Sequence, residues 1–258
     1  MSVERRDDST HRCQAPKRDS GRSQYLPKRF YKEAVWRAEG QAYSILLDER
    51  PVKTPCGNAL ILPGQELAME IAQEWQEQGE HIDPETMPLT KLAYTAIDHV
   101  AGRKQEIIED ILSFAGSDLL CYRADGPDGL DALQKEHWDP VLNWFAASLN
   151  ARFTVAVGVV HVGQPEDALS AIRDVLTVYD PFRLAALRNV TTLTGSALLA
   201  VALSIRKLSA EEAWRAAHVD EDFQISKWGE DSQAQARRAK RWTEIVASHR
   251  FDVLAAAT

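Results

Sequence analysis

Short apolar or alternating segments fill residues 30–62, and residues that favour turns separate them. The segments are Phe30–Val35, Tyr43–Leu47 and Ala59–Leu62. The intervening Glu39-Gly40, Asp48-Glu49 and the sequence Pro-Cys-Gly-Asn at 55–58 are typical of tight turns. The pattern predicts a small antiparallel sheet of hairpins. Such a sheet needs a helix over one face, because alone it buries too little apolar surface.

Helical spacing of apolar residues takes over after Gly64 and continues to the end of the chain. The predicted helices cover residues 65–78, 89–100, 105–115, 130–138, 140–149, 166–178, 181–207, 209–228 and 231–254. Asp139 and Asp180 each precede a proline, a pair typical of an N-cap followed by the first helical residue. The helix after Asp180 contains the most apolar segment and is predicted to be central and buried. Residues 153–160 are β-branched and apolar, which predicts a single strand or an extended crossover.

Strands and helices therefore occupy separate parts of the chain, the arrangement of an α+β protein. Residues 1–28 are rich in Arg, Ser, Asp and Gln, and we expect a disordered tail there. A small β-rich N-terminal domain with its covering helix is predicted over residues 29–85. A larger all-α C-terminal domain is predicted over residues 86–258.

Charge is unevenly distributed in this 258-residue chain, whose formal net charge is −8. Residues 1–29 carry eight Lys/Arg against four Asp/Glu, so this segment is +4 and the remainder is −12. An acidic body argues against a general nucleic-acid binder or a protein of anionic membrane surfaces. The most apolar segment, residues 195–205, is about half the ~20 residues that span a bilayer. We expect neither nucleic acid nor membrane as a partner.

The sequence lacks the usual signatures of catalytic, nucleotide-binding and metal-binding sites. The three cysteines share no metal-ligand spacing, and Cys121 is expected to be a buried structural residue rather than a nucleophile. His218 and Asp222 are four residues apart on a predicted helix and could face one metal ion. A metal-dependent hydrolase that uses Asp220 to Asp222 is therefore the alternative function, although a solvated acidic face explains these residues better.

Glu221 is the most informative anomaly in the sequence. On a continuous helix from Ser209 to Trp228 it lies in the centre of an apolar stripe. The stripe contains Ala210, Trp214, Ala217, Ile225 and Trp228, with Gln224 at its edge. A carboxylate in such a stripe is costly unless it is paired or faces a wet binding surface. Two explanations stay open: an ion pair with an arginine of a neighbouring helix (Arg183, Arg188, Arg237 or Arg238), or an acid on a binding face.

Six segments, taken together and in this order, resemble a known protein family. They are Arg29–Val35, Tyr43–Pro55, Met87–Asp98, Asp118–Ala124, Trp138–Trp144 and Asp222–Glu230. The chain resembles the chaperones that assemble the catalytic head of the F-type ATP synthase, specifically the member that receives the alpha subunit. The resemblance covers about residues 29–255. It implies a small β-containing domain followed by a helical domain, in agreement with the periodicity.

The resemblance also implies a function without catalysis or cofactor. Such a chaperone binds the unassembled alpha subunit and prevents its aggregation until beta subunits arrive. Acidic residues of the C-terminal domain are implicated, and the matching positions here are Glu221 and Glu230. The expected client-binding residues are Asp220, Glu221, Asp222, Gln224, Trp228 and Glu230. A generic helical scaffold without client specificity is a third possibility.

The resemblance carries an expectation for location. Mitochondrial members of the family have a transit peptide, whereas the first 29 residues here contain Glu4, Asp7, Asp8 and Asp19. We therefore expect a bacterial cytoplasmic protein; a eukaryotic origin would place it in the mitochondrial matrix. We expect it to be a monomer.

Overall fold

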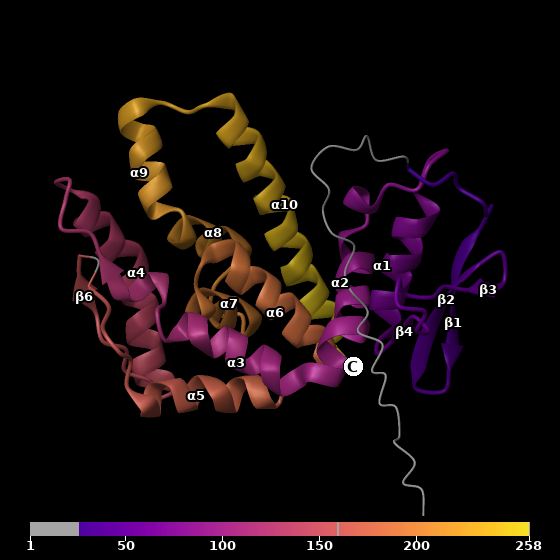
Figure 1. Ribbon diagram of the computed structural model, residues 1–258, viewed down its shortest axis with the longest axis horizontal. Helices are drawn as coiled ribbons and strands as arrows, with labels where there is room; N and C mark the ends of the chain where they lie inside the picture. Colours follow the sequence, from indigo (N-terminus) through magenta and orange to yellow (C-terminus); the bar gives the residue numbers. More distant parts are fainter. Residues whose placement is uncertain (1–25, 159, 258) are drawn as a thin grey trace, which may run out of the picture.

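The computed structural model describes residues 26–158 and 160–257 of the chain (Figure 1). A small sheet near the N-terminus precedes a mostly helical remainder, so the predicted α+β fold class is confirmed. The predicted tail, residues 1–28, lies outside the described residues except for its last three positions. There Lys28 forms a β-bridge with His81, and Ile82 donates its backbone N–H to the Pro27 carbonyl at 2.8 Å. Pro27 and Lys28 are therefore paired through their backbone with residues 81 and 82.

The sheet is built around strand β2. The strands are β1 (Ala34–Glu39), β2 (Ala42–Leu47), β3 (Arg50–Pro51) and β4 (Ile61–Leu62). β1 pairs with one side of β2, and β3 and β4 pair with its other side, all antiparallel. Gly40 turns the β1–β2 hairpin with φ +69°, a left-handed conformation that glycine adopts without strain. The predicted hairpins are therefore present.

The first predicted strand, Phe30–Val35, is displaced, because β1 begins only at Ala34. The preceding residues lie against the end of helix α1 (Gln65–Gln76) instead. The Arg29 guanidinium donates to the Gln76 carbonyl at 3.1 Å, and the Tyr31 hydroxyl donates to the Trp75 carbonyl at 2.7 Å. The last carbonyls of a helix lack partners within it, so these side chains satisfy them in place of strand pairing.

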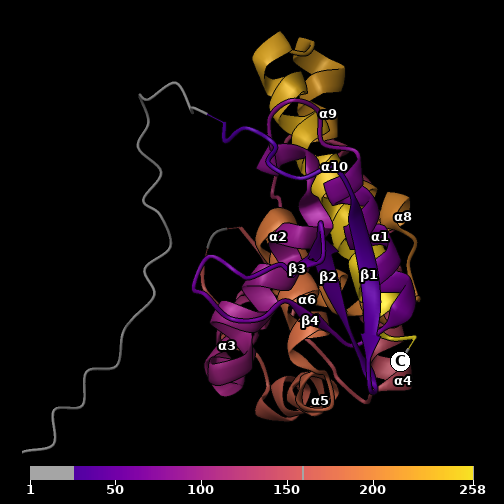
Figure 2. The ribbon, with the colours of Figure 1, turned by 90° about the vertical axis from the view of Figure 1, so that its right-hand side faces the viewer.

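Helix α1 covers one face of the sheet, as predicted (Figure 2). Its buried residues are Leu67, Ala68, Ile71, Ala72 and Trp75. The helices that follow are α2 (Pro88–Thr95), α3 (Lys104–Ala115), α4 (Leu130–Ser148), α5 (Glu166–Thr177), α6 (Pro181–Thr194), α7 (Ala197–Ser204), α8 (Ala210–Ala217), α9 (Val219–Trp228) and α10 (Ser232–Ala255). A π-helical turn, η2 (Ala96–Val100), continues α2. Short 3-10 turns cover Pro84–Thr86, Ala101–Arg103 and Leu119–Cys121.

The prediction that Asp139 caps a helix opened by Pro140 is wrong, because α4 runs through both residues. Pro140 is exposed, so the carbonyl that its missing N–H leaves without a partner can face water. Trp138 and Phe145 are fully buried on either side of the proline and hold the helix continuous. The Asp139 carboxylate instead accepts a hydrogen bond from Arg123 at 2.6 Å.

The predicted single helix over residues 181–207 is two helices, α6 and α7. Gly195 ends α6 in the left-handed region, with φ +69°, and Ser196 caps α7. The Asp118 carboxylate accepts hydrogen bonds from the Ser196 hydroxyl at 2.7 Å and from the Leu198 N–H at 3.0 Å. Asp118 is fully buried, and burial raises the pKa of its carboxyl to about 6. The prediction that this region is central and buried is confirmed for α7, whose eight residues are all buried.

The predicted helix over residues 209–228 also divides, into α8 and α9, at His218. The His218 ring donates from Nδ1 to the Trp214 carbonyl at 2.8 Å, while the His218 backbone N–H bonds to Arg215 O. Ser209 and Glu212, whose spacing is typical of a capping box, form one at the start of α8. The apolar stripe derived for one continuous helix is therefore wrong, because the helix is interrupted between Ala217 and Glu221.

Within 153–160, the described residues contribute the short strand β6 (Ala156–Val157), which pairs in parallel with β5 (Tyr122–Arg123). The Thr154 N–H and carbonyl bond instead to the Gln164 side chain, at 2.8 and 3.0 Å. In the part of this segment that the structure describes, the predicted strand is therefore two residues long.

Helix α10 links the two parts of the molecule. Its C-terminal residues Phe251 and Leu254 are buried in the same core as α1 and the sheet, while Ile245 belongs to the core of the helical part. Deep in this junction the Asp252 carboxylate accepts from Arg183 at 3.0 Å and from Ser204 at 2.9 Å. The predicted helix over residues 231–254 is confirmed. In the described part of the chain, no helix is long and apolar enough to cross a membrane.

Candidate functional site

All six predicted client-binding residues lie on one protrusion, which we name the C-terminal hairpin. It comprises α9, the turn 229–231 and residues 232–242 of α10. Figure 1 and Figure 2 show α9 and the start of α10 rising together beyond the other helices. Gly229 ends α9 with φ +82°, and the Asp231 carboxylate caps α10 by accepting from the Ala234 N–H at 3.2 Å. Local caps thus define both ends of the turn.

Glu221 is an ion-pair partner between the two arms of the hairpin. Its carboxylate oxygens lie 3.1 and 3.2 Å from Arg241 Nη2, and its Oε2 atom lies 3.7 Å from Arg238 Nη1. The Glu221 side chain is 34% exposed. Of the two explanations left open by the sequence, the pairing with a neighbouring helix is therefore present. Arg238 was among the four candidates, whereas Arg241 was missed.

The two aspartates beside Glu221 point to different partners. Asp220 accepts a hydrogen bond from Gln134 Nε2 on α4 at 2.8 Å. Asp222 forms an ion pair with Arg238 on α10. His218 Nε2 lies 3.7 Å from Glu221 and not against Asp222. The side chains of His218, Asp220 and Asp222 therefore contact different partners instead of pointing toward one shared position.

Aromatic rings pack beside these ion pairs. The centroid of the Trp214 ring lies 3.7 Å from that of His218 and 5.5 Å from that of Trp242. The Arg238 guanidinium carbon lies over Trp214, 5.5 Å from its ring centroid. His218 is buried, and burial lowers its pKa, so the ring is neutral near pH 7. Sequence analysis missed Trp242 and Arg241, although both follow Arg238 at helical spacing.

Gln224, Trp228 and Glu230 form a second group, at the tip of the hairpin. All three are exposed, and the Trp228 side chain has 85% of its surface in solvent. A fully exposed tryptophan is unusual, because its large apolar surface favours burial or a partner. The six predicted residues are thus divided between a cross-linked base and an exposed tip.

The remaining candidate chemistry lies elsewhere. Cys121 is buried, and burial raises the pKa of its thiol to about 12, as expected for a structural cysteine. Among the residues that the structure describes, no group of three or more His, Cys, Asp or Glu side chains could hold a metal ion. The Asp220, Glu221 and Asp222 side chains, which the alternative hydrolase would use, bond to Gln134, Arg241 and Arg238 respectively.

Known proteins with the same architecture identify the family. The family model described as ATP12 chaperone protein matches residues 28–146. The crystal structure of Atp12 from Paracoccus denitrificans has 38% sequence identity and a TM-score of 0.84, covering 89% of this chain and 98% of that chain. The chain belongs to the ATP12 chaperone family. It is accordingly an ATP12-type assembly chaperone of the ATP synthase.

Other ATP12-like proteins extend the comparison. A candidate chaperone from Agrobacterium tumefaciens has 44% identity and a TM-score of 0.86, covering 89% of this chain and 86% of that chain. The mitochondrial protein atp12 of Schizosaccharomyces pombe is 23% identical over 214 residues, 78% of this chain and 74% of that protein. The solved structure of an aspartate-to-lysine variant of the Paracoccus protein matches equally well, with 38% identity and a TM-score of 0.84.

Two of the segments that carry the resemblance to ATP12 proteins meet in the structure. The Asp98 carboxylate, in the π-helical turn after α2, accepts from the Thr54 hydroxyl at 2.6 Å and from Asn58 Nδ2 at 2.8 Å. The loop that precedes β4 is thereby fixed to the helical part. These family residues act as scaffold at the junction, away from the C-terminal hairpin.

Proposed function

We propose that this protein binds the unassembled alpha subunit of the ATP synthase catalytic head and prevents its aggregation until beta subunits arrive. A subunit interface is a large and partly apolar surface, which aggregates while it lacks its partner. A protein that holds such a surface needs exposed aromatic contacts and charge that keeps the complex soluble.

The single observation that carries this proposal is Trp228 at the tip of the C-terminal hairpin. It combines 85% exposure with neighbouring Gln224 and Glu230, both exposed polar groups. Tryptophan is enriched among the residues that dominate binding energy at protein interfaces. We propose that the tip contacts the client directly.

Glu221, Asp220 and Asp222 complete the proposed client-binding face. Glu221 retains a third of its side-chain surface, so it can meet a client while it pairs with Arg241. Asp220 and Asp222 are exposed on the same helix. Their ion pairs and hydrogen bonds also hold α9 at a defined angle to α10 and α4, which positions the tip.

The test is capture of the client from native cells, followed by an aggregation assay. Tagged protein should recover the ATP synthase alpha subunit and little else, and the purified protein should suppress aggregation of isolated alpha subunit without ATP. Strict dependence of this suppression on ATP, or recovery of many unrelated proteins, would count against the proposal. The second result would favour a generic scaffold.

The protein is proposed to act as a monomer without catalysis or cofactor, in the bacterial cytoplasm. The higher identity to the two bacterial proteins than to the yeast one supports this location. Fractionation of the source cells followed by immunodetection tests it.

A further inference from the structure

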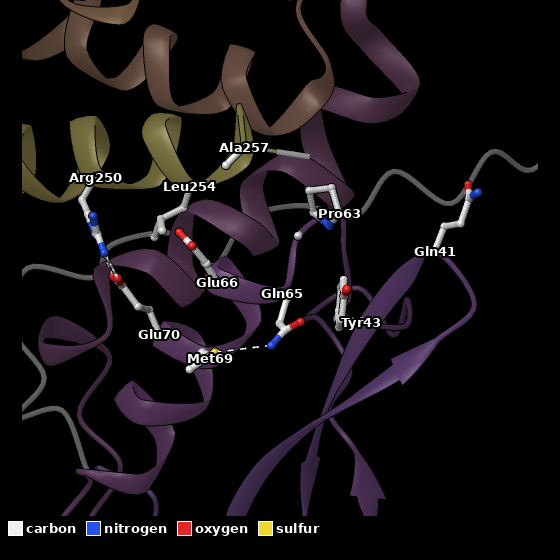
Figure 3. Close-up of a pocket in the computed structure, with 11 residues that line it drawn as sticks. Gln41, Tyr43, Pro63, Gln65, Glu66, Met69, Glu70, Arg250, Leu254 and Ala257 are labelled. Carbon is white, nitrogen blue, oxygen red and sulfur yellow. Dashed lines mark hydrogen bonds and ion pairs between the residues drawn. The ribbon is translucent and has the colours of Figure 1, made fainter.

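A groove runs between strand β1 and helix α1, on the opposite part of the molecule from the C-terminal hairpin. One hollow of about 420 Å³ is lined by Ala34, Val35 and Trp36 of β1 and by Met69 and Gln76 of α1. A second hollow of about 980 Å³ continues toward the end of α10 (Figure 3). Met69 lines both hollows. Trp36 of the first hollow and Tyr43 of the second are in edge-to-face contact, with their ring centroids 5.8 Å apart, so the two hollows form one groove.

On the side of this groove, β1 has no strand partner among the described residues. Glu33 O accepts from Asp48 N–H on the side of β2, whereas the Ala34 N–H points the other way and donates to Gln76 Oε1 at 2.8 Å. Backbone groups alternate sides along a strand, so Trp36 and Ala38 direct their N–H and carbonyl groups outward. Among the described strands, none pairs with this edge. Natural edge strands are usually covered, since such groups attract another strand.

Side chains along the groove define the chemistry of its occupant. Met69 is 48% exposed and Val35 is 38% exposed, so the groove presents apolar surface to solvent. The exposed face of α1 supplies acid, because Glu66 and Glu70 line the second hollow. Arg250, the one cation among the described residues that line the two hollows, pairs with Glu70. Figure 3 shows Glu66 and the Glu70–Arg250 pair on the same wall. An occupant that carries a lysine or arginine complements this excess of acid.

We propose that the groove binds an extended segment of the client polypeptide, which adds to β1 as a further strand. Outward main-chain groups of Trp36 and Ala38 would pair with the segment. An apolar side chain would lie against Met69, and a basic side chain would lie near Glu66. Strand addition to an exposed edge obtains affinity from main-chain hydrogen bonds and specificity from side-chain pockets. The identity of the client rests on the proposed function, while the surface is separate from the C-terminal hairpin.

Two variants test the groove, with the alpha subunit of the same organism as the probe. Ala38→Pro removes one outward N–H, a change that edge strands tolerate because the ladder to β2 is kept. Met69→Gln removes the apolar contact at nearly constant size. Each should weaken binding of the alpha subunit about tenfold, the loss expected for one hydrogen bond or one apolar side chain. The controls Ala38→Val, which keeps the N–H, and Val178→Gln, at an 81% exposed site on the helical part, should bind as wild type.

Hydrogen exchange gives an independent readout that needs no variant. The amides of Trp36 and Ala38 should exchange rapidly in the protein alone and become protected in its complex with the alpha subunit. Should Ala38→Pro lose its native circular dichroism, Met69→Gln and amide protection decide the question.

The outcomes separate the groove from the function. Failure of the wild-type protein to bind the alpha subunit overturns the proposed function and with it the client named here. Binding by wild type that neither variant weakens, with Trp36 and Ala38 unprotected, overturns only the groove. A dimer of the wild-type protein that Ala38→Pro converts to a monomer would assign the edge to a second copy, and would also overturn the proposal.

Discussion

Arg241 Nη2 on α10 lies 3.1 Å from the Glu221 carboxylate on α9, so an ion pair ties the two arms of the C-terminal hairpin together. Arg238 adds a second link, because it lies 3.7 Å from Glu221 and also pairs with Asp222. The acid singled out by the sequence thus has a structural partner and still keeps a third of its side-chain surface in solvent.

Glu221→Gln should lower the free energy of unfolding by about 1 kcal/mol. This value lies between the ~0.5 kcal/mol of surface changes and the 3–5 kcal/mol of a broken buried pair, because solvent screens a partly exposed carboxylate. Binding of the alpha subunit should weaken as well, since the charge belongs to the proposed client-binding face. Urea unfolding and a binding titration measure the two effects.

The exposed Glu136→Gln on α4 is the matched control for Glu221→Gln and should change neither quantity. A loss of 3 kcal/mol or more in Glu221→Gln, with full client affinity, would make the residue purely structural.

Trp228→Ala should leave the free energy of unfolding within about 0.5 kcal/mol of wild type, because the side chain is 85% exposed. Client affinity should fall by at least about thirtyfold, corresponding to the 2 kcal/mol typical of a dominant tryptophan contact. Val178→Ala, an equally exposed apolar site on the helical part, serves as control. Unchanged affinity of Trp228→Ala would remove the tip from the proposed binding face.

Asp139→Ala should cost about 2 kcal/mol of stability. Arg123 is only 5% exposed and loses its carboxylate partner, but Asp139 is 48% exposed, so water can replace part of the interaction. The exposed pair of Asp131 and Lys135 on the same helix provides the control, and Asp131→Ala should cost no more than about 0.5 kcal/mol. Equal losses in both variants would contradict the structural importance of the Arg123 contact.

Acid should destabilise the protein through His218. Burial lowers its pKa in the folded state, so its contribution to stability is fully present above the unfolded pKa of about 6.5 and is lost as pH falls through the lower folded value. Arg238 and Arg241 also oppose protonation, whereas Glu221 favours it. Urea unfolding at pH 7 and pH 5 should show a larger decrease for wild type than for His218→Gln.

His249 has a pKa lowered by burial too, so only the difference between wild type and His218→Gln isolates His218. An identical pH dependence in both proteins would show that His218 is protonated equally in the folded and unfolded states.

Features that depend on neighbours within a few residues could be read from the sequence. The strand region before the helices, the buried face of α1, the capping box at Ser209 and the cap at Asp180 follow from spacing and local hydrogen bonding. The family resemblance likewise rested on short segments in order. These elements could be predicted without knowing which residues pack against them in the fold.

Tertiary structure decided the features that join distant residues. Gly195 and the Ser196 cap divide the helix that periodicity predicted as continuous, and the Asp118 carboxylate, 80 residues before Leu198 in the chain, accepts the Leu198 N–H at the start of α7. Asp139 accepts a hydrogen bond from Arg123 instead of capping a helix, and Glu221 pairs with Arg241, 20 residues later. The groove beside β1 arises only because α1, which carries Met69, and the end of α10 meet there. Periodicity specifies which face of an element is buried, but side-chain partners across the fold depend on how those faces come together.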